Sequence, residues 1–187
     1  MKELYKIAAA AATRVYERCT DLGTTEYDLS LQFWNGHWVQ VLAFAGTNEF
    51  KDWFSNLRLF SRKGIKTSAL NAAIEVHKVI QPKLHIGLQL IVTGHSKGAA
   101  EAIAYAKMYR ADYCIAFCPA RCLRPWTNRK MPNTTIFIDP DDVVPKLAFI
   151  TFKHPKCARI ELKKDVIGLS IKEHFMSHIN RYIEENL

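Results

Sequence analysis

Long hydrophobic runs are absent from this sequence of 187 residues. No apolar stretch approaches the roughly 20 residues that a membrane-spanning helix needs. The alanine-rich stretch at 7–12 is short, and Arg14, Glu17 and Arg18 follow it without a typical cleavage site, so we do not expect a signal peptide. Repeats, low-complexity segments and linkers rich in proline, glycine or serine are also absent. These absences predict a soluble protein with one domain over residues 1–187.

Cysteine is scarce, and its number is odd. The five cysteines have no paired close spacing: Cys19, Cys114, Cys118, Cys122 and Cys157. A disulfide framework is therefore not expected, and buried, reduced thiols are the default, which favours a reducing compartment such as the cytoplasm. The cysteines at 114, 118 and 122 come without a matching pair of histidines, so we expect no metal site.

Acidic residues are fewer than basic ones. The chain has 18 Asp and Glu against 26 Lys and Arg, which gives a formal net charge of +8. A basic surface suits an anionic membrane surface, acidic substrates or nucleic acid. Because no recognisable nucleic-acid-binding module occurs, nucleic acid is the least favoured of these partners. Composition carries no signal for the oligomeric state.

What is present is an alternation of helical and strand patterns. The first helix has an apolar face made of Leu4, Ala8, Ala11 and Val15. Asn35 and Gly36 form a hairpin signal before an almost wholly apolar strand at 38–45. Further helices are predicted at 68–80, 99–109 and 179–185, and further strands at 88–92, 113–117, 134–138 and 158–162. Strands separated by helices predict an α/β fold whose mostly parallel sheet is covered on both faces.

The most informative segment is the G-x-S-x-G motif at 94–98, where Ser96 stands between two glycines. An apolar strand precedes the motif, and a helix of small residues follows it. In this context a serine on a sharp strand-to-helix turn projects its hydroxyl outward, and the glycines allow the turn and the close passage of backbone. The motif therefore predicts a nucleophilic serine rather than an ordinary turn.

A serine hydroxyl needs a base to take its proton, and the base is usually a histidine oriented by a carboxylate. Aspartates at 139, 141 and 142 directly follow the predicted strand at 134–138, and His174 and His178 come later in the chain. This order, serine then acid then histidine, is the order found in α/β-hydrolases. The backbone N–H of Lys97 and that of Thr47, in the loop after an earlier strand, are candidate donors to an oxyanion.

Three segments together resemble the fungal-type (class 3) lipase branch of the α/β-hydrolases. They are Ala43-Phe44-Ala45-Gly46-Thr47, the elbow segment at 92–98 and Asp142-Val143-Val144-Pro145. The resemblance implies an α/β-hydrolase fold with Thr47 in the oxyanion hole, Ser96 as nucleophile and Asp142 as acid. It favours His178 as base, since an aromatic residue, Tyr182, follows shortly after it; His174 is the alternative.

The sequence departs from the family pattern at three places. Ala45 replaces an arginine, Ala99 replaces a second glycine, and Lys97 stands where leucine is common. The chain is also short, so a small or absent lid is expected. The candidate lid region at 48–66 mixes aromatic and basic residues and supplies the candidate substrate-binding residues Phe50, Trp53 and Leu57.

The resemblance implies a serine carboxylic-ester hydrolase that works through an acyl-enzyme, without a metal or other cofactor. Its substrate would be an ester or a lipid such as a phospholipid or acylglycerol, and an anionic membrane surface is a candidate partner. The alternative is a catalytically silent hydrolase-like module that binds a lipid surface or a protein. Lipase, esterase and acyltransferase activities all stay open at this point.

Overall fold

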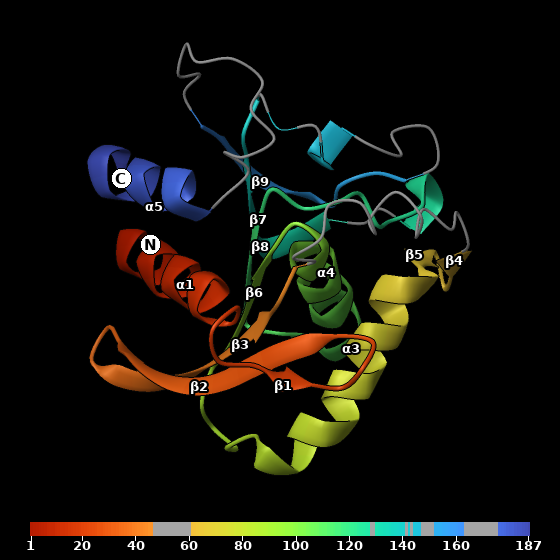
Figure 1. Ribbon diagram of the computed structural model, residues 1–187, viewed down its shortest axis with the longest axis horizontal. Helices are drawn as coiled ribbons and strands as arrows, with labels where there is room; N and C mark the ends of the chain where they lie inside the picture. Colours follow the sequence, from red (N-terminus) through yellow and green to blue (C-terminus); the bar gives the residue numbers. More distant parts are fainter. Residues whose placement is uncertain (47–60, 128–129, 141, 143, 147–151, 163–175) are drawn as a thin grey trace.

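A seven-stranded sheet with the order β1-β2-β3-β6-β7-β8-β9 forms the centre of the molecule (Figure 1). The computed structural model describes residues 1–46, 61–127, 130–140, 142, 144–146, 152–162 and 176–187. The strands of the sheet are β1 (Thr20–Asp21), β2 (Glu26–Trp34), β3 (His37–Phe44), β6 (Leu90–His95), β7 (Tyr113–Phe117), β8 (Lys130–Ile138) and β9 (Lys156–Glu161). β3, β6, β7, β8 and β9 pair in parallel, and β1 and β2 extend the sheet antiparallel.

Helices cover both faces of this sheet, as predicted. α1 (Lys2–Arg14) and α5 (Met176–Asn186) lie side by side on one face, and α3 (Thr67–Ile80) and α4 (Lys97–Tyr109) lie on the other (Figure 1). A short hairpin of β4 (Ser61–Arg62) and β5 (Ile65–Lys66) precedes α3. Single 3₁₀ turns occupy Gln81–Lys83, Pro125–Thr127 and Val144–Lys146. The α/β fold class with a mostly parallel sheet is therefore confirmed.

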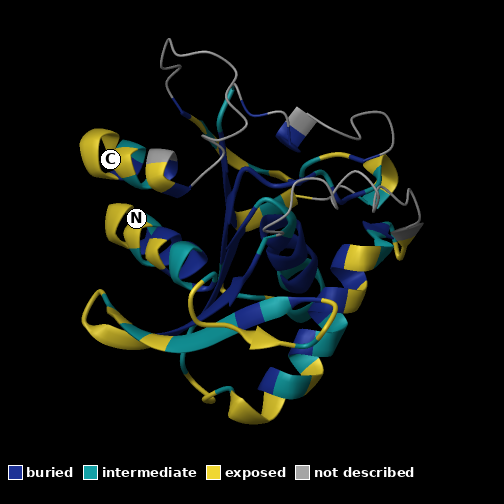
Figure 2. Cartoon of the chain, in the orientation of Figure 1, coloured by how far each residue is buried: buried dark blue, intermediate teal, exposed yellow. Residues whose placement is uncertain are grey.

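The interior strands are apolar on both sides because each face meets a helical layer. Along β6, Ile91 packs with the α1 and α5 layer, whereas Val92 packs with the α3 and α4 layer. Side chains alternate across a strand, so neighbouring residues enter opposite cores. In Figure 2 the central strands are buried, and exposed residues lie on the outer strands, the helix surfaces and the connecting loops.

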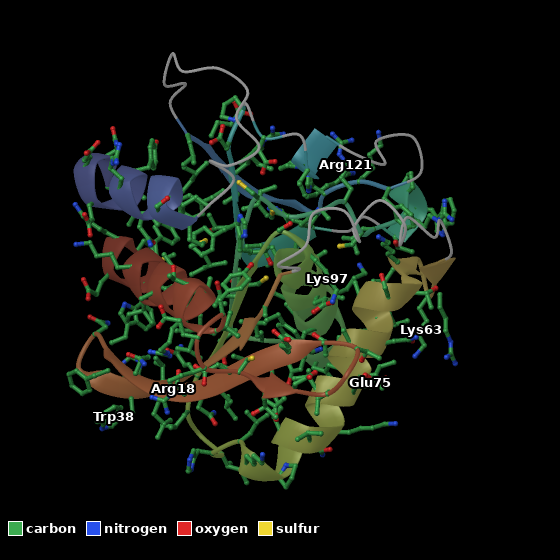
Figure 3. All side chains as sticks on the ribbon, viewed as in Figure 1. Arg18, Trp38, Lys63, Glu75, Lys97 and Arg121 are labelled. Atoms are coloured by element: carbon green, nitrogen blue, oxygen red, sulfur yellow. The ribbon has the colours of Figure 1, made fainter. Side chains whose placement is uncertain are left out.

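The outer hairpin of β2 and β3 turns at Asn35 and Gly36, as predicted. Both residues have a positive φ, of 50° and 85°, which is the backbone that a two-residue hairpin turn requires. Near its tip, Phe33 and Trp38 stack edge to face, 5.6 Å apart, and both are exposed. Trp38 lies at the periphery of the molecule (Figure 3).

The sequence also makes predictions about the cysteines and about membrane-spanning helices. The five cysteines are free thiols; Cys114, Cys118 and Cys122 are buried, as predicted, whereas Cys19 is exposed and Cys157 is half-buried. A cytoplasmic location stays a prediction. Among the helices of the described chain, none is long and apolar enough to span a membrane.

Candidate active site

Ser96 occupies the sharp turn between β6 and α4. Its backbone angles are φ 55° and ψ −115°, a left-handed conformation that non-glycine residues rarely adopt. The N–H of Ser96 donates to the carbonyl of Phe117 on β7 (3.0 Å), and its own carbonyl accepts from the N–H of Ala120 (3.3 Å). Backbone held in a sparsely populated region by its neighbours is typical of functional sites. The motif predicts a turn over 94–98, whereas in the structure the strand continues to His95 and only Ser96 separates it from α4.

The two glycines of the motif are required by close backbone contacts. A Cβ at Gly98 would lie 2.2 Å from the carbonyl oxygen of Phe44, the last residue of β3. A Cβ at Gly94 would lie 2.6 Å from the backbone of Gly98 and 2.8 Å from the same Phe44 oxygen. Without side chains here, α4 begins directly against the end of β3. This packing sets where the elbow stands relative to the loop that starts at Ala45.

Asp142 lies at the same edge of the sheet as Ser96. It follows β8, whereas Ser96 follows β6, and β7 is the strand between them. Asp142 is buried, and its Oδ1 accepts a hydrogen bond from the N–H of Val144 (2.8 Å). Of the other aspartates, Asp139 is half-buried, and Asp141 lies outside the described residues. The carboxyl edge of a parallel sheet is where α/β proteins place their sites.

Cys118 lies between these two residues, at the end of β7, and sequence reasoning treated it only as a buried thiol. Its N–H donates to the carbonyl of Phe137 (2.8 Å), and its side chain contacts the carboxylate of Asp142. Burial first, and then the negative charge of Asp142, raises the pKa of this thiol well above its usual value. The thiol therefore keeps its proton and faces the candidate acid as a neutral group. Its position directly after an apolar strand is the feature of the sequence that places Cys118 at the carboxyl edge of the sheet, where Asp142 also lies.

The candidate bases are only partly described. The backbone of His178 belongs to α5, which packs on α1 through buried Ile179 and Ile183, and Asn180 donates from Nδ2 to Oγ1 of Thr13 (3.3 Å). The imidazole of His178 and all of His174 lie outside the described residues. The choice of His178 over His174 therefore stays a prediction.

Of the two candidate oxyanion donors, Lys97 is among the described residues and Thr47 is not. Lys97 is the first residue of α4, so its N–H points out of a helix N-terminus, where negative charge is favoured. Thr47 and the candidate substrate-binding residues Phe50, Trp53 and Leu57 lie outside the described residues.

Tyr16 supports the loop that leads to Thr47, and sequence reasoning missed it. Its hydroxyl accepts a hydrogen bond from the N–H of Gly46 (3.1 Å) and lies 3.4 Å from Nδ1 of His95 in the elbow. Burial raises the pKa of Tyr16 to about 12, so the phenol stays neutral. The residue follows the first helix, and nothing in the local pattern indicates that its hydroxyl reaches residues 30 and 79 positions away.

His77 on α3 contacts two tyrosines of α4. Nδ1 of His77 lies 3.0 Å from the hydroxyl of Tyr105, and its ring stacks on Tyr109. Within the described residues, no group of His, Cys, Asp and Glu is arranged to hold a metal ion.

Comparisons with known proteins find the same architecture in fungal lipases. The lipase of Rhizomucor miehei in its propeptide complex superposes with a TM-score of 0.62 at 15% identity, covering 87% of this chain and 68% of that one. The Lip2 lipase of Yarrowia lipolytica gives 0.59 at 13% identity, covering 88% and 80%. A triacylglycerol lipase of Penicillium expansum gives 0.58 at 14% identity, covering 86% and 79%.

Similarity in sequence is local. A segment of 66 residues is 39% identical to an extracellular phospholipase A1 of Serratia liquefaciens; it covers 35% of this chain and only 19% of the length of that protein. No family model matches the chain. What the comparisons establish is that this chain has the α/β-hydrolase fold of the fungal lipases.

Proposed function

We propose that the chain is a serine carboxylic-ester hydrolase, a lipase or esterase that acts through an acyl-enzyme. The observation that carries the proposal is Ser96 itself: a half-buried serine with a positive φ, at the carboxyl edge of a parallel sheet and the start of a helix. The contacts that exclude any side chain at Gly94 and Gly98 support it, because they serve only the tight elbow.

In the proposed mechanism, Oγ of Ser96 attacks the ester carbonyl while His178 takes its proton. Asp142 holds the imidazole in the required orientation and stabilises the imidazolium. The N–H groups of Lys97 and Thr47 bind the oxyanion of the tetrahedral intermediate. His178 then returns the proton to the departing alcohol. In the second half of the reaction, His178 takes a proton from water, the water attacks the acyl-enzyme, and the proton passes to Oγ of Ser96 as the acid is released.

A phospholipid or acylglycerol is the substrate class we favour. The local match to a protein named as a phospholipase A1 and the common fold with triacylglycerol lipases support this choice. The net charge of +8 supports approach to an anionic lipid surface. The proposed mechanism needs no metal or organic cofactor.

The test is hydrolysis of p-nitrophenyl esters with short and long acyl chains by the wild type and by Ser96→Ala. We expect the variant to lose at least about 10³-fold in kcat/KM, as removal of a catalytic nucleophile does. Ser68→Ala, an exposed serine on α3, is the matched control and should retain full activity.

A fluorophosphonate probe gives an independent readout, because it reacts covalently only with an activated serine. We expect a single adduct on Ser96 in the wild type and none in Ser96→Ala. A wild type that neither hydrolyses esters nor takes the label would refute the enzyme and favour the silent lipid- or protein-binding module.

A further inference from the structure

A buried carboxylate on α4 has no part in the proposed chemistry. Glu101 is only 1% exposed, on a helix whose neighbouring positions are mostly alanine. A carboxylate in such a place is costly unless partners satisfy it. Glu101 lies one helical turn after Lys97, so the side chain of Lys97 can reach its carboxylate.

The partners of Glu101 connect the elbow to the loop between β1 and β2. Its Oε1 lies 3.3 Å from Nζ of Lys97, and its Oε2 accepts a hydrogen bond from Oγ1 of Thr25 (2.7 Å). Nζ of Lys97 also donates to the carbonyl of Thr24 (3.3 Å). The side chain of Lys97, which is 33% exposed, is therefore held between the carboxylate of Glu101 and the carbonyl of Thr24; Figure 3 labels Lys97 beside α4.

The loop that receives these contacts is itself anchored. The hydroxyl of Thr24 bonds to the carboxylate of Glu75 on α3, and the N–H of Leu22 donates to the carbonyl of Thr25 (3.0 Å). The first turn of α4 is thus joined through Glu101 and Lys97 to a loop fixed against a second helix.

We propose that Glu101 is a positioning residue for ester hydrolysis: it holds the side chain of Lys97 and thereby keeps the Lys97 N–H directed at the oxyanion. The inference rests on the proposed function. Glu101 does not touch the substrate; it acts through Lys97. Since an oxyanion donor stabilises the transition state more than the bound ester, a misplaced donor lowers kcat rather than raising KM.

Charge and position predict opposite effects for Glu101→Gln. The carboxylate faces two cations, Lys97 and Lys66, and the phenol of Tyr16 lies within its field. If charge alone mattered, removing one negative charge beside the oxyanion would raise kcat. If position matters, the neutral amide releases Lys97 and kcat falls. The sign of the change therefore decides between the two.

The experiment measures kcat and KM of the wild type and Glu101→Gln on a p-nitrophenyl ester at pH 8.5. The concentration of active sites in each preparation is determined on a separate sample by complete labelling with the fluorophosphonate, and kcat is given per active site. We expect kcat to fall about tenfold, less than the 10²-fold or more that follows complete loss of a donor, with KM within about twofold. An unchanged or raised kcat in a folded, active-site-titrated variant overturns the proposal.

The pH dependence separates this role from a general loss of packing. Burial, opposed by Lys97, Thr25 and Lys66, raises the pKa of Glu101 to about 7. The ratio of wild-type to variant kcat should therefore decline from about ten at pH 8.5 towards one at pH 6, where Glu101 is protonated in the wild type. Titration of the base is common to both proteins and cancels in the ratio. A ratio that stays constant with pH contradicts the proposal.

A double-mutant cycle with Lys97→Met tests whether Glu101 acts through Lys97. In that background, Glu101→Gln should change kcat by less than about twofold, since no ammonium remains to be held. A further tenfold loss would show a separate role and overturn the proposal.

If Glu101→Gln does not fold, Thr25→Val is the second variant, because it removes only the hydrogen bond to Oε2. It should lower kcat about threefold, and an unchanged kcat counts against the proposal. An inactive wild type would instead refute the proposed function.

Discussion

At the scale of single residues, the elbow shows what the two glycines of the motif are for. The sequence pattern predicts that Gly94 and Gly98 permit close backbone passage. The structure identifies the approaching atom as the carbonyl oxygen of Phe44. The same atom limits both glycines, so the end of β3 and the start of α4 are packed as one unit.

We expect Gly98→Ala to destabilise the protein by about 3 kcal/mol or more, since overpacking of a rigid site outweighs the gain of about 1 kcal/mol in helix propensity. The matched comparison is Gly46→Ala, whose Cβ would lie 2.4 Å from the hydroxyl of Tyr16, a side-chain atom, and 3.0 Å from the carbonyl oxygen of His95, so its nearest backbone contact is looser than the 2.2 Å at Gly98. Its cost should be smaller. Chemical denaturation of both variants is the measurement; equal costs would mean that the Phe44 carbonyl can also move.

Glu101 also predicts how stability depends on pH. Its pKa rises from an ordinary 4.5 in the unfolded chain to about 7 in the fold, mainly because it is buried. Between these values the folded state keeps a proton that the unfolded state has lost, so unfolding is favoured as pH rises. The contribution of Glu101 to stability should therefore fall by up to about 3 kcal/mol from pH 4.5 to pH 7, at about 1.4 kcal/mol per pKa unit.

Urea denaturation of the wild type and Glu101→Gln between pH 4.5 and 8 is the measurement. The stability of the wild type relative to the variant should decline across this interval and level off above pH 7. Parallel stability curves would contradict a raised pKa for Glu101 in the folded state.

At the scale of elements, helix and strand positions follow closely from pattern, whereas their ends do not. The strand expected at 88–92 is β6 and continues to His95, because the following elbow takes a single residue. The short strands β1, β4 and β5 have too few residues to show a periodicity, and the last two form through pairing: Ile65 bridges to Leu123 outside the main sheet. Tertiary contacts set these boundaries.

α5 carries the backbone of the candidate base His178, and the choice between His178 and His174 makes a clear prediction. We expect His178→Ala to abolish ester hydrolysis, with a loss of at least about 10³-fold in kcat. His174→Ala should retain most of the activity, because the resemblance to the fungal-type lipases assigns the base to the histidine that Tyr182 shortly follows. The p-nitrophenyl ester assay checks both variants. Loss of activity on replacement of His174 alone would reverse the assignment.

At the scale of the whole molecule, several basic residues lie on the segments that continue from the end of β7 and pair with the β4–β5 hairpin. The chain leaves the end of β7 beside the elbow and pairs with the β4–β5 hairpin, where the N–H of Arg124 donates to the carbonyl of Gly64 (2.8 Å). Arg62 and Lys63 are exposed on this hairpin, and Trp126, 73% exposed, lies under the guanidinium of Arg124. Cations beside an exposed aromatic ring are suited to an anionic lipid surface.

We expect the protein to co-sediment with vesicles that contain anionic phospholipid and to be released at about 0.5 M salt, since the Debye length then falls well below 8 Å. Arg62→Glu with Lys63→Glu should weaken binding more than Lys2→Glu with Lys6→Glu, although each pair lowers the net charge from +8 to +4. The second pair lies near the start of α1, whose other end reaches Gly46 through Tyr16. Equal effects of the two pairs would show that net charge alone drives binding.

Of this protein, the sequence by itself determined the class of fold, the order of its longer helices and strands and the identity of the candidate nucleophile. Those properties depend on local periodicity and on a motif whose five residues are contiguous. Only the tertiary structure decided that Tyr16 reaches Gly46, that Cys118 lies against Asp142 and that Glu101 and Lys97 connect the elbow to the loop at 24–25. These contacts join residues from different strands and helices, and their geometry comes from the packing of the sheet rather than from any pattern along the chain.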